Sequence, residues 1–413
     1  MDFDTAHKST IVRSMDRKNI TATLGGDPEF FIEDSKGTIL NADKFFPSKE
    51  KPIIIGAKND LQSKLFFDGI QAEIAPGHTT CREYLTDNIW HCFNRVYRDI
   101  PEDHRVTLVP SAKIDKEVIE NAGPEARIFG CMPDFNAYTL TVNTAEMDAS
   151  EHPYRYAGGH MHFGISSNYQ KEGMPEFDLA QKEEGHIRAV KFMDLLVSIP
   201  TLMLDNGPGS KLRRDKYGKA GCFRPTPYGI EYRTPSCWWL KSPMTASLVY
   251  GLGRLAWTMM VSGVDEDLRK AIGFDDEAVR GAVDETDITT AYQIWEKMRP
   301  YVALSSATRA NPLHIASASS SHYEDVFPSS FTKRMPEHRG KTVYALAVFE
   351  YMLKNGLESV INPNVKSEWH VGNPSQWRNT RGFMVGSYQG LKGNPDFMKF
   401  QKSFLKEKVY TKA

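Results

Sequence analysis

The chain has 413 residues, 40% hydrophobic and 25% charged, which is enough for one large core or two smaller domains. Its 51 basic and 52 acidic side chains leave a net charge of -1, so a nucleic-acid-coating surface is not indicated, whereas a small anionic ligand remains open. No apolar run has the roughly 18 residues of a membrane span, and five dispersed cysteines without a C-x-x-C pair favour reduced thiols in a cytoplasmic setting.

The sequence pattern of the N-terminal part of the chain predicts several strands, followed by a helix. Residues 1–20 are polar and predict a flexible arm. From Thr21 onward, TATLGGDPEFFIED and a turn at residues 35–37 predict a hairpin, and KLFFDGIQAEIAP predicts a second extended pair that turns at residues 68–69. Residues 79–99 repeat apolar side chains every three to four positions, which predicts a helix.

The middle of the chain alternates strands, loops and helices. RVTLVP predicts a short strand, FGCMPDFNAYTLT a loop entering a strand, and YRYAGGHMHFGIS one strand with a glycine pair near its start. Residues 183–206 predict an apolar helix interrupted at Pro200. Residues 211–227 predict a basic, glycine-rich loop that feeds the strand GIEYRTPS, and residues 243–262 predict another helix.

Beyond Gly263 the pattern is mainly helical, most clearly near residues 288–298 and 341–355. The predicted class is therefore α+β, with an antiparallel or mixed sheet, helices on one face and a mainly helical C-terminal region. The predicted boundaries are 1–20 for the arm, 21–262 for the α+β domain and 263–413 for the helical region.

Four separate strand segments place polar side chains two residues apart, and such side chains point to the same face of a strand. If these strands share a sheet, one of its faces is a strongly polar concavity. The four pairs are Asp27 with Glu29, Gln71 with Glu73, His160 with His162, and Glu231 with Arg233.

Carboxylates and imidazoles in such a concavity suit magnesium or manganese. Phosphoryl transfer requires positioning and positive charge on the transferring oxygens, and arginine supplies both. Arg213, Arg214 and Arg224 precede the Glu231 strand, and glycines interleaved with them, among them Gly221, would let backbone amides approach an anion. The combination suggests transfer of the terminal phosphate of ATP to a carboxylate, followed by attack of an amine.

Each segment taken alone also has a structural interpretation. Asp27-Pro28-Glu29 is typical of a surface turn, the histidine pair of solvated strand residues, and Glu231 with Arg233 of an ion pair. Asp134 fits a turn as well as it fits the site. We expect no function for four other histidines and a core or pocket-wall position for a tryptophan pair: His78, His91, His152, His186, and Trp238 with Trp239.

Five segments together resemble a known family, the phage-associated carboxylate–amine ligases, or type-2 amidoligases, which are distant relatives of glutamine synthetase and glutamate–cysteine ligase. They occur in the order of the family and cover roughly residues 21–262. The segments are GGDPEFFI, FFDGIQAEIAP, FGCMPDFNAY, AGGHMHFGI and RRDKYGKAGCFRPTPYGIEYRTPSCWWL.

The resemblance implies a glutamine synthetase-like catalytic sheet, ATP, and two or three magnesium or manganese ions. It assigns Arg224, Arg233 and Glu231 to catalysis. Its implied metal ligands are Asp27, Glu29, Glu73, His160 and Glu231, with His162 as an alternative to His160 at the nucleotide-side metal. Its implied nucleotide or substrate contacts are Arg213, Arg214, Gly159, His162 and Gly221.

The implied partners are a small-molecule or peptide carboxylate and an amine, with no membrane, in the cytoplasm of a phage-infected bacterium. A homo-oligomer is open, because relatives of glutamine synthetase often build sites between subunits. The sequence departs from glutamine synthetase in its Asp-x-Glu segment, in the missing small N-terminal domain and in residues 263–413. Two alternatives remain: a metal-dependent hydrolase, and a phage structural or binding protein on a ligase-like scaffold.

Overall fold

The computed structural model describes residues 22–56, 62–80, 82–124, 134–143, 152–165, 172–307 and 345–359, together with residues 361, 367, 369 and 399. The predicted N-terminal arm lies outside these residues, as do parts of the loop before Asp134 and most of the region after residue 307. Within the described residues, no helix combines the length and the apolar composition that crossing a membrane requires.

The first sheet has six antiparallel strands in the order β1-β12-β14-β13-β9-β10. It joins strands from distant parts of the chain, so the predicted segments around His162 and Glu231 become neighbours. The strands are β1 (Thr23–Gly26), β9 (Asp134–Asn136), β10 (Thr141–Asn143), β12 (Met161–Gly164), β13 (Cys222–Thr226) and β14 (Gly229–Tyr232).

The second sheet has the order β3-β2-β6-β5-β4, with β7 (Arg105–Thr107) also paired to β2. Both predicted hairpins are confirmed here, since β2 pairs with β3 and β5 pairs with β6. Gly69 follows β5 with a φ of 64°, a conformation that glycine adopts without steric cost. The other strands are β2 (Glu29–Glu33), β3 (Ile39–Leu40), β4 (Ile53–Ile55), β5 (Ser63–Asp68) and β6 (Gln71–Ala75).

The single strand predicted for YRYAGGHMHFGIS is wrong, because the structure divides it. β11 (Tyr154–Tyr156) pairs with β8 (Ser111–Lys113), whereas β12 belongs to the first sheet. The break at Gly158–His160 lets the chain pass from one ribbon to the other, so His160 lies just before a strand instead of within it.

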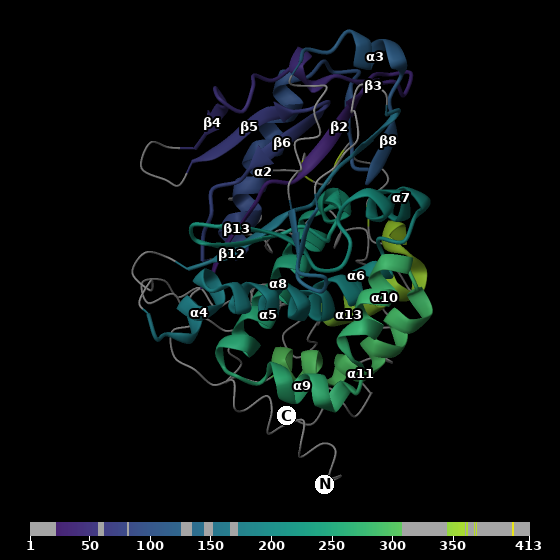
Figure 1. The fold of residues 1–413 in the computed structure, drawn as a ribbon. Coiled ribbons are helices and arrows are strands. Elements are labelled where there is room, and N and C mark those ends of the chain that lie inside the picture. The colour runs from purple at the N-terminus through teal and green to yellow at the C-terminus, as the bar shows by residue number, and fades with distance from the viewer. Residues whose placement is uncertain are drawn as a thin grey trace, which may run out of the picture.

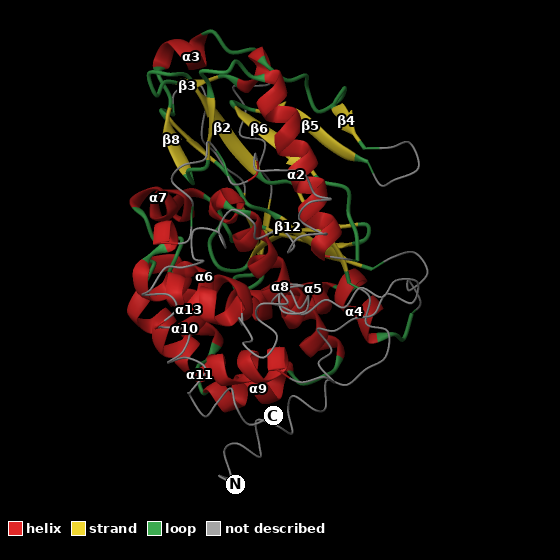
Figure 2. Ribbon diagram, turned by 180° about the vertical axis from the view of Figure 1, so that it is seen from behind, coloured by secondary structure: helices red, strands yellow, loops and turns green. Residues whose placement is uncertain are grey.

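The second sheet is covered by α2 (Arg82–Asp99), which runs across its back in Figure 2. The ring centroids of Phe30 on β2 and Phe93 on α2 lie 5.3 Å apart in this layer. This helix confirms the prediction for residues 79–99, and burial of its apolar stripe against the strands stabilises it. A short helix, α3 (Lys116–Glu120), lies near β8 at the same end of the molecule.

The first sheet packs its apolar face on helices, and Figure 1 shows them gathered below its strands. Phe163, Ile230, Tyr232 and Trp239 are buried in this layer, which confirms a core position for the tryptophan pair. The α+β class with antiparallel sheets and helices on one face is thereby confirmed. The covering helices are α4 (Pro175–Gln181), α5 (Glu183–Met193) and α8 (Pro243–Val261).

The helix predicted for residues 183–206 is interrupted earlier than expected. A π-helical turn, Asp194–Ser198, lies between α5 and α6 (Ile199–Leu202). Pro200 has no N–H to bond the carbonyl of Leu196, and the wider turn precedes it. The turn brings Asp194 and Ser198 to the same tyrosine of β14, as described below.

The basic loop predicted for residues 211–227 is wrong. The chain forms α7 (Pro208–Lys216), then a glycine turn, then β13. Pro208 stands at the first helical turn, where proline is favoured, and φ values of 79° and 82° at Gly218 and Gly221 reverse the chain. Arg213 and Arg214 thus lie on a helix.

The predicted helical C-terminal region is confirmed where the structure describes it. Helices α9 and α10 pack beside α11, and α13 follows later in the chain (Figure 1). The elements are α9 (Asp265–Ile272), α10 (Asp276–Glu285), α11 (Ile288–Ala307) and α13 (Ala345–Asn355), with 3-10 turns at Ala42–Lys44, Cys237–Lys241 and Leu357–Ser359.

Candidate active site

The polar residues gather where the two sheets meet. Only Asp27 and Pro28 separate β1 of the first sheet from β2 of the second. The amide of Glu29 donates to Gly158 O (2.9 Å), and the amide of Ile74 donates to Pro28 O (3.2 Å). The prediction of one shared sheet face is therefore wrong: Asp27 and Glu29 belong to no common strand, and the four segments face each other across a seam.

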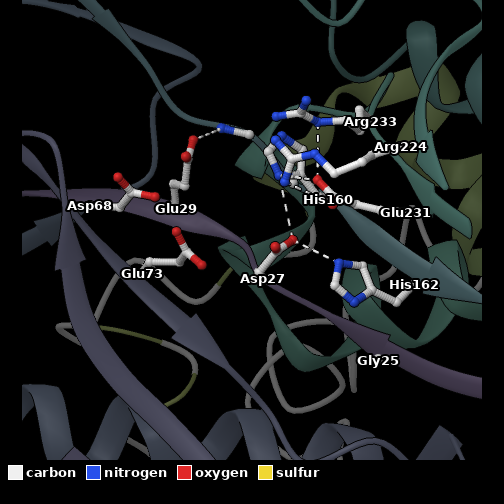
Figure 3. A network of polar contacts seen from close by, with 12 residues as sticks. Gly25, Asp27, Glu29, Asp68, Glu73, His160, His162, Arg224, Glu231 and Arg233 are labelled. Carbon is white, nitrogen blue, oxygen red and sulfur yellow. Dashed lines mark hydrogen bonds and ion pairs between the residues drawn. The ribbon is translucent and has the colours of Figure 1, made fainter. Parts of the chain in front are cut away.

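Asp27 lies at the centre of one group of side chains, shown in Figure 3. Its Oδ1 is 3.0 Å from Nε2 of His162 and 3.4 Å from Nδ1 of His160. On its other side the ring of His162 meets Tyr228, whose hydroxyl is 2.8 Å from Nδ1. The two histidines thus converge on one carboxylate, although only His162 lies within β12.

Glu231 is the second centre, and the strand register explains it. His162, Glu231 and Arg224 are consecutive partners across β12, β14 and β13. The carboxylate of Glu231 lies 3.0 Å from Nε of Arg233, 3.3 Å from Nη1 of Arg224 and 3.4 Å from Nδ1 of His160. The predicted proximity of Glu231 and Arg233 is present.

Three side chains have the spacing of a cation site. One ligand atom each from Asp27, His162 and Glu231 lies within 4.8 Å of the other two. Two carboxylates and one imidazole form a donor set that suits magnesium or manganese. The residues present therefore fit the predicted divalent ion.

Burial and charge perturb this group. Burial alone would raise the pKa of Asp27, but the charges and hydrogen bonds of His162 and His160 outweigh it and hold that pKa well below its usual range. The pKa of His162 is raised, because Asp27 outweighs the effect of burial. Burial and the charge of Arg233 lower the pKa of His160. Asp27 is thus ionised at neutral pH.

Glu29 and Glu73 are register partners on β2 and β6, and both are buried. Oε2 of Glu29 accepts from the Gly158 amide (2.6 Å) and from the Tyr217 hydroxyl (3.1 Å). Burial raises the pKa of Glu29 to about 7, and burial together with nearby carboxylates raises that of Glu73 well above its usual range. This second group has more carboxylates than positively charged side chains. A bound cation would stabilise the ionised form of these carboxylates.

A cavity of about 600 Å³ opens beside both groups. Of the seven residues expected to share one hollow, Asp27, Glu73 and His162 line it. The other four do not line it and are buried behind its wall: Glu29, His160, Glu231 and Arg233.

Several lining residues were missed from the sequence. Lys49 lies 3.9 Å from Oε1 of Glu73 and 3.5 Å from Oδ2 of Asp68. Tyr228 contacts His162, and His78, for which no function was expected, lines the same cavity. All three stand in turns or loops, where no alternating pattern marks the direction of a side chain.

Arg213 and Arg214 are occupied by the protein itself. The guanidinium of Arg213 donates to the carbonyls of Thr234 and Arg233, both at 2.9 Å. That of Arg214 donates to Asp205 O at 2.7 Å. Both side chains are buried, so the structure places neither in the cavity that was expected to receive nucleotide or substrate.

The two glycines expected to contact substrate have structural surroundings. The carbonyl of Gly159 accepts from Trp239 Nε1 (3.1 Å), and a Cβ there would come within 2.1 Å of Ser236 O. The amide of Gly221 does meet an anion, but that anion is the carboxylate of Asp194, at 2.6 Å. Close packing therefore explains the glycine at position 159, and the hydrogen bond to the buried carboxylate of Asp194 accounts for the role of the Gly221 amide.

Asp194 anchors the strands that carry the site. In addition to the Gly221 amide, its carboxylate accepts from the hydroxyls of Tyr232 (2.5 Å) and Thr234 (3.2 Å). The Tyr232 hydroxyl also lies 2.5 Å from Ser198 Oγ, at the other end of the π-helical turn. Tyr232 stands between Glu231 and Arg233, so this network fixes the backbone from which both project.

Asp194 should make stability depend on pH. Burial raises its pKa in the folded protein to about 7 from 3.8, although its hydrogen bonds oppose the shift. The unfolded chain therefore loses its proton first, and the free energy of unfolding falls as the pH rises from about 4 to 7. Three pKa units correspond to about 4 kcal/mol. We expect urea unfolding of Asp194→Asn to lack this loss, and an unchanged pH slope in the variant would contradict the assignment.

Comparison with known proteins supports a family. Residues 138–306 match the family model described as "Phage phiEco32-like COOH.NH2 ligase-type 2". This segment contains β12, β13 and β14 with His160, His162 and Glu231. No curated protein matches the sequence.

Two solved structures are distantly similar in fold. A bifunctional glutathione synthetase from Pasteurella multocida is 11% identical with a TM-score of 0.35, over 76% of this chain and 50% of that chain. A novel glutamine synthase homolog is 12% identical with a TM-score of 0.29, over 75% and 73% of the two chains. This chain thus matches half the length of the Pasteurella enzyme, and likenesses this remote carry no argument about activity. The similarity to the phage phiEco32-like COOH.NH2 ligase-type 2 family is thus carried by residues 138–306, which are less than half of the chain.

Proposed function

We propose that the protein uses ATP to join a carboxylate to an amine through an acyl-phosphate intermediate. The observation that carries the proposal is the convergence of Asp27, His162 and Glu231, from separate segments of the chain, beside a cavity of about 600 Å³. A ligase must hold anionic phosphates and a carboxylate in one place. Here the cavity wall combines side chains that can ligate a metal ion with positively charged lysine and arginine side chains nearby.

Asp27, His162 and Glu231 would hold a magnesium or manganese ion, with Glu29 and Glu73 as candidates for further ions across the seam. When bound, such an ion neutralises phosphate oxygens and orients the terminal phosphate of ATP. His160 lies 3.4 Å from both Asp27 and Glu231, where it holds the two carboxylates in place.

In the proposed first step, a carboxylate oxygen of the substrate attacks the terminal phosphorus of ATP. A bond from that oxygen to phosphorus forms as the bond to ADP breaks. In the second step, the nitrogen lone pair of the amine attacks the acyl carbon, phosphate leaves with the electrons of the broken carbon–oxygen bond, and the nitrogen loses a proton. The protein's part is to position these groups and to stabilise their charge.

The two arginines of the site have different surroundings. Arg224 keeps about a third of its side chain exposed while it contacts Glu231, so it can reach a phosphate or carboxylate. Arg233 is fully buried, with Nε 3.0 Å from Oε1 of Glu231 and Nη1 3.9 Å from Oδ2 of Asp134. We therefore propose that Arg224 contacts substrate and that Arg233 positions Glu231. Asp134 belongs to this buried group.

The test is a coupled assay of ADP release over a panel of carboxylates and amines, with magnesium or manganese present. We expect release only when both substrates are supplied. A protein that binds zinc but no nucleotide would contradict the proposal in favour of a metal-dependent hydrolase. Absence of both ATP and divalent-ion binding would favour a phage structural or binding protein on a ligase-like scaffold.

A further inference from the structure

Two basic side chains line the cavity without contacting its acidic groups. Lys64 stands on β5 and His78 follows the end of β6, and both are exposed to the hollow. Among the residues that the structure describes, neither has a hydrogen-bond or ion-pair partner. In contrast, Lys49 in the same wall is already committed to Asp68 and Glu73.

The backbone under this pair is held at three points. The amide of Gly77 donates to Ser63 Oγ (2.8 Å), which ties the residue before His78 to the residue before Lys64. Asn88 on α2 donates to Gly77 O (2.7 Å). Thr79 and Leu24 exchange two backbone hydrogen bonds, at 2.7 and 2.9 Å. The backbone segments that carry Lys64 and His78 are therefore tied to each other and fixed in place.

The backbone of Gly25 lines the cavity next to His78. Gly25 stands opposite His162 in the first sheet, and a Cβ on Gly25 would be 3.3 Å from that of His78 and 3.6 Å from that of His162. These are close contacts for a Cβ, so glycine leaves the backbone of β1 uncovered where it lines the cavity, and a ligand can approach that backbone.

Lys64 is separated from Glu73 by a short stretch of strand. In the β5–β6 hairpin, Lys64 pairs with Ala75 and Phe66 pairs with Glu73, so Lys64 lies two residues from the level of Glu73. Two residues of strand span about 7 Å. Phe66 stands at the level of Glu73 and lines the same cavity.

We propose that Lys64 and His78 form an oxyanion subsite, which binds a phosphate or carboxylate group of a ligand whose other anionic end lies at the divalent ion that Asp27 would hold. The inference rests on the proposed ligase function for the identity of that other end. The group that Lys64 and His78 bind is either a phosphate of the nucleotide or a second carboxylate of the acyl substrate. Both sources present anionic oxygens that the side chains of Lys64 and His78 can bind.

The test is isothermal titration calorimetry of the full chain with three probes: inorganic phosphate, the magnesium complex of AMPPNP, and glutarate. Lys64→Gln/His78→Gln is compared with Lys51→Gln/His91→Gln, which removes the same side-chain types outside the cavity. We expect a loss of affinity of tenfold or more for at least one probe in the first variant and less than twofold in the second. Manganese affinity should stay at the wild-type level in both.

Loss of AMPPNP affinity assigns the subsite to the nucleotide, and loss of glutarate affinity alone assigns it to the acyl substrate. Wild-type behaviour of Lys64→Gln/His78→Gln with all three probes, including no binding by either protein, overturns the subsite. If that happens while carboxylate- and amine-dependent ADP release persists, the ligase function stands. If phosphate affinity depends on the two residues but no substrate pair yields ADP, the subsite stands and the ligase function fails.

Discussion

Asp27→Asn is expected to lower manganese affinity at least about a hundredfold and ADP release about a thousandfold. The carboxylate is the shared partner of His160 and His162, and it is one of three atoms within 4.8 Å of one another. Asparagine keeps its shape but removes the charge that a divalent ion requires. Electron paramagnetic resonance of bound manganese measures the first effect without knowledge of the substrates.

Asp115→Asn is the matched control, because Asp115 is exposed and its side chain makes no capping hydrogen bond at the start of α3. Its manganese affinity should equal that of the wild type. Circular dichroism should show that both variants keep the fold. Manganese affinity within threefold of the wild type in Asp27→Asn would remove Asp27 from the proposed ligand set.

Arg233→Met is expected to lower the free energy of unfolding by about 3–5 kcal/mol, because a buried carboxylate loses its cation. Glu231 is 2% exposed, and its remaining ion pairs among the residues that the structure describes are with His160 and the partly exposed Arg224. Urea denaturation measures the change. If the unpaired carboxylate of Glu231 causes this loss, then adding the substitution Glu231→Leu should restore part of the lost stability, because it removes that buried charge.

Arg280→Met provides the comparison at the surface. Arg280 pairs with Glu277 and Asp284 at 3.5 and 3.6 Å on α10, where water screens the charges. Its removal should cost less than about 1 kcal/mol. Equal losses in Arg233→Met and Arg280→Met would show that the buried pair contributes no more than a surface pair.

The local pattern of the sequence predicted those elements whose side chains repeat with a clear period. The alternation in residues 70–74 and the glycine at position 69 were sufficient for the β5–β6 hairpin, and three-to-four spacing was sufficient for α2 and α8. The same alternation brought Glu231 and Arg233 together. These contacts form between near neighbours, so a short window of sequence contains the information.

The errors came from features that depend on distant partners. GGDPEFFI looks continuously extended, and nothing local shows that its two halves enter different sheets. Arg213 and Arg214 look solvated until the carbonyls and the aspartate that bind them are known. His78 lacks any periodic signal, because its direction depends on the hydrogen bonds of Gly77 to β5 and α2.

The two-residue connection between β1 and β2 limits which sequence changes this protein can accept during evolution. Glu29 faces the acidic seam, while Phe30 points to Phe93 on α2, so a single inserted or deleted residue before β2 would exchange their directions. Substitutions can be absorbed there one side chain at a time, but a change of length would carry a benzyl ring into the seam and a carboxylate into the apolar layer. Insertions and deletions should therefore be far rarer at Asp27-Pro28 than point replacements.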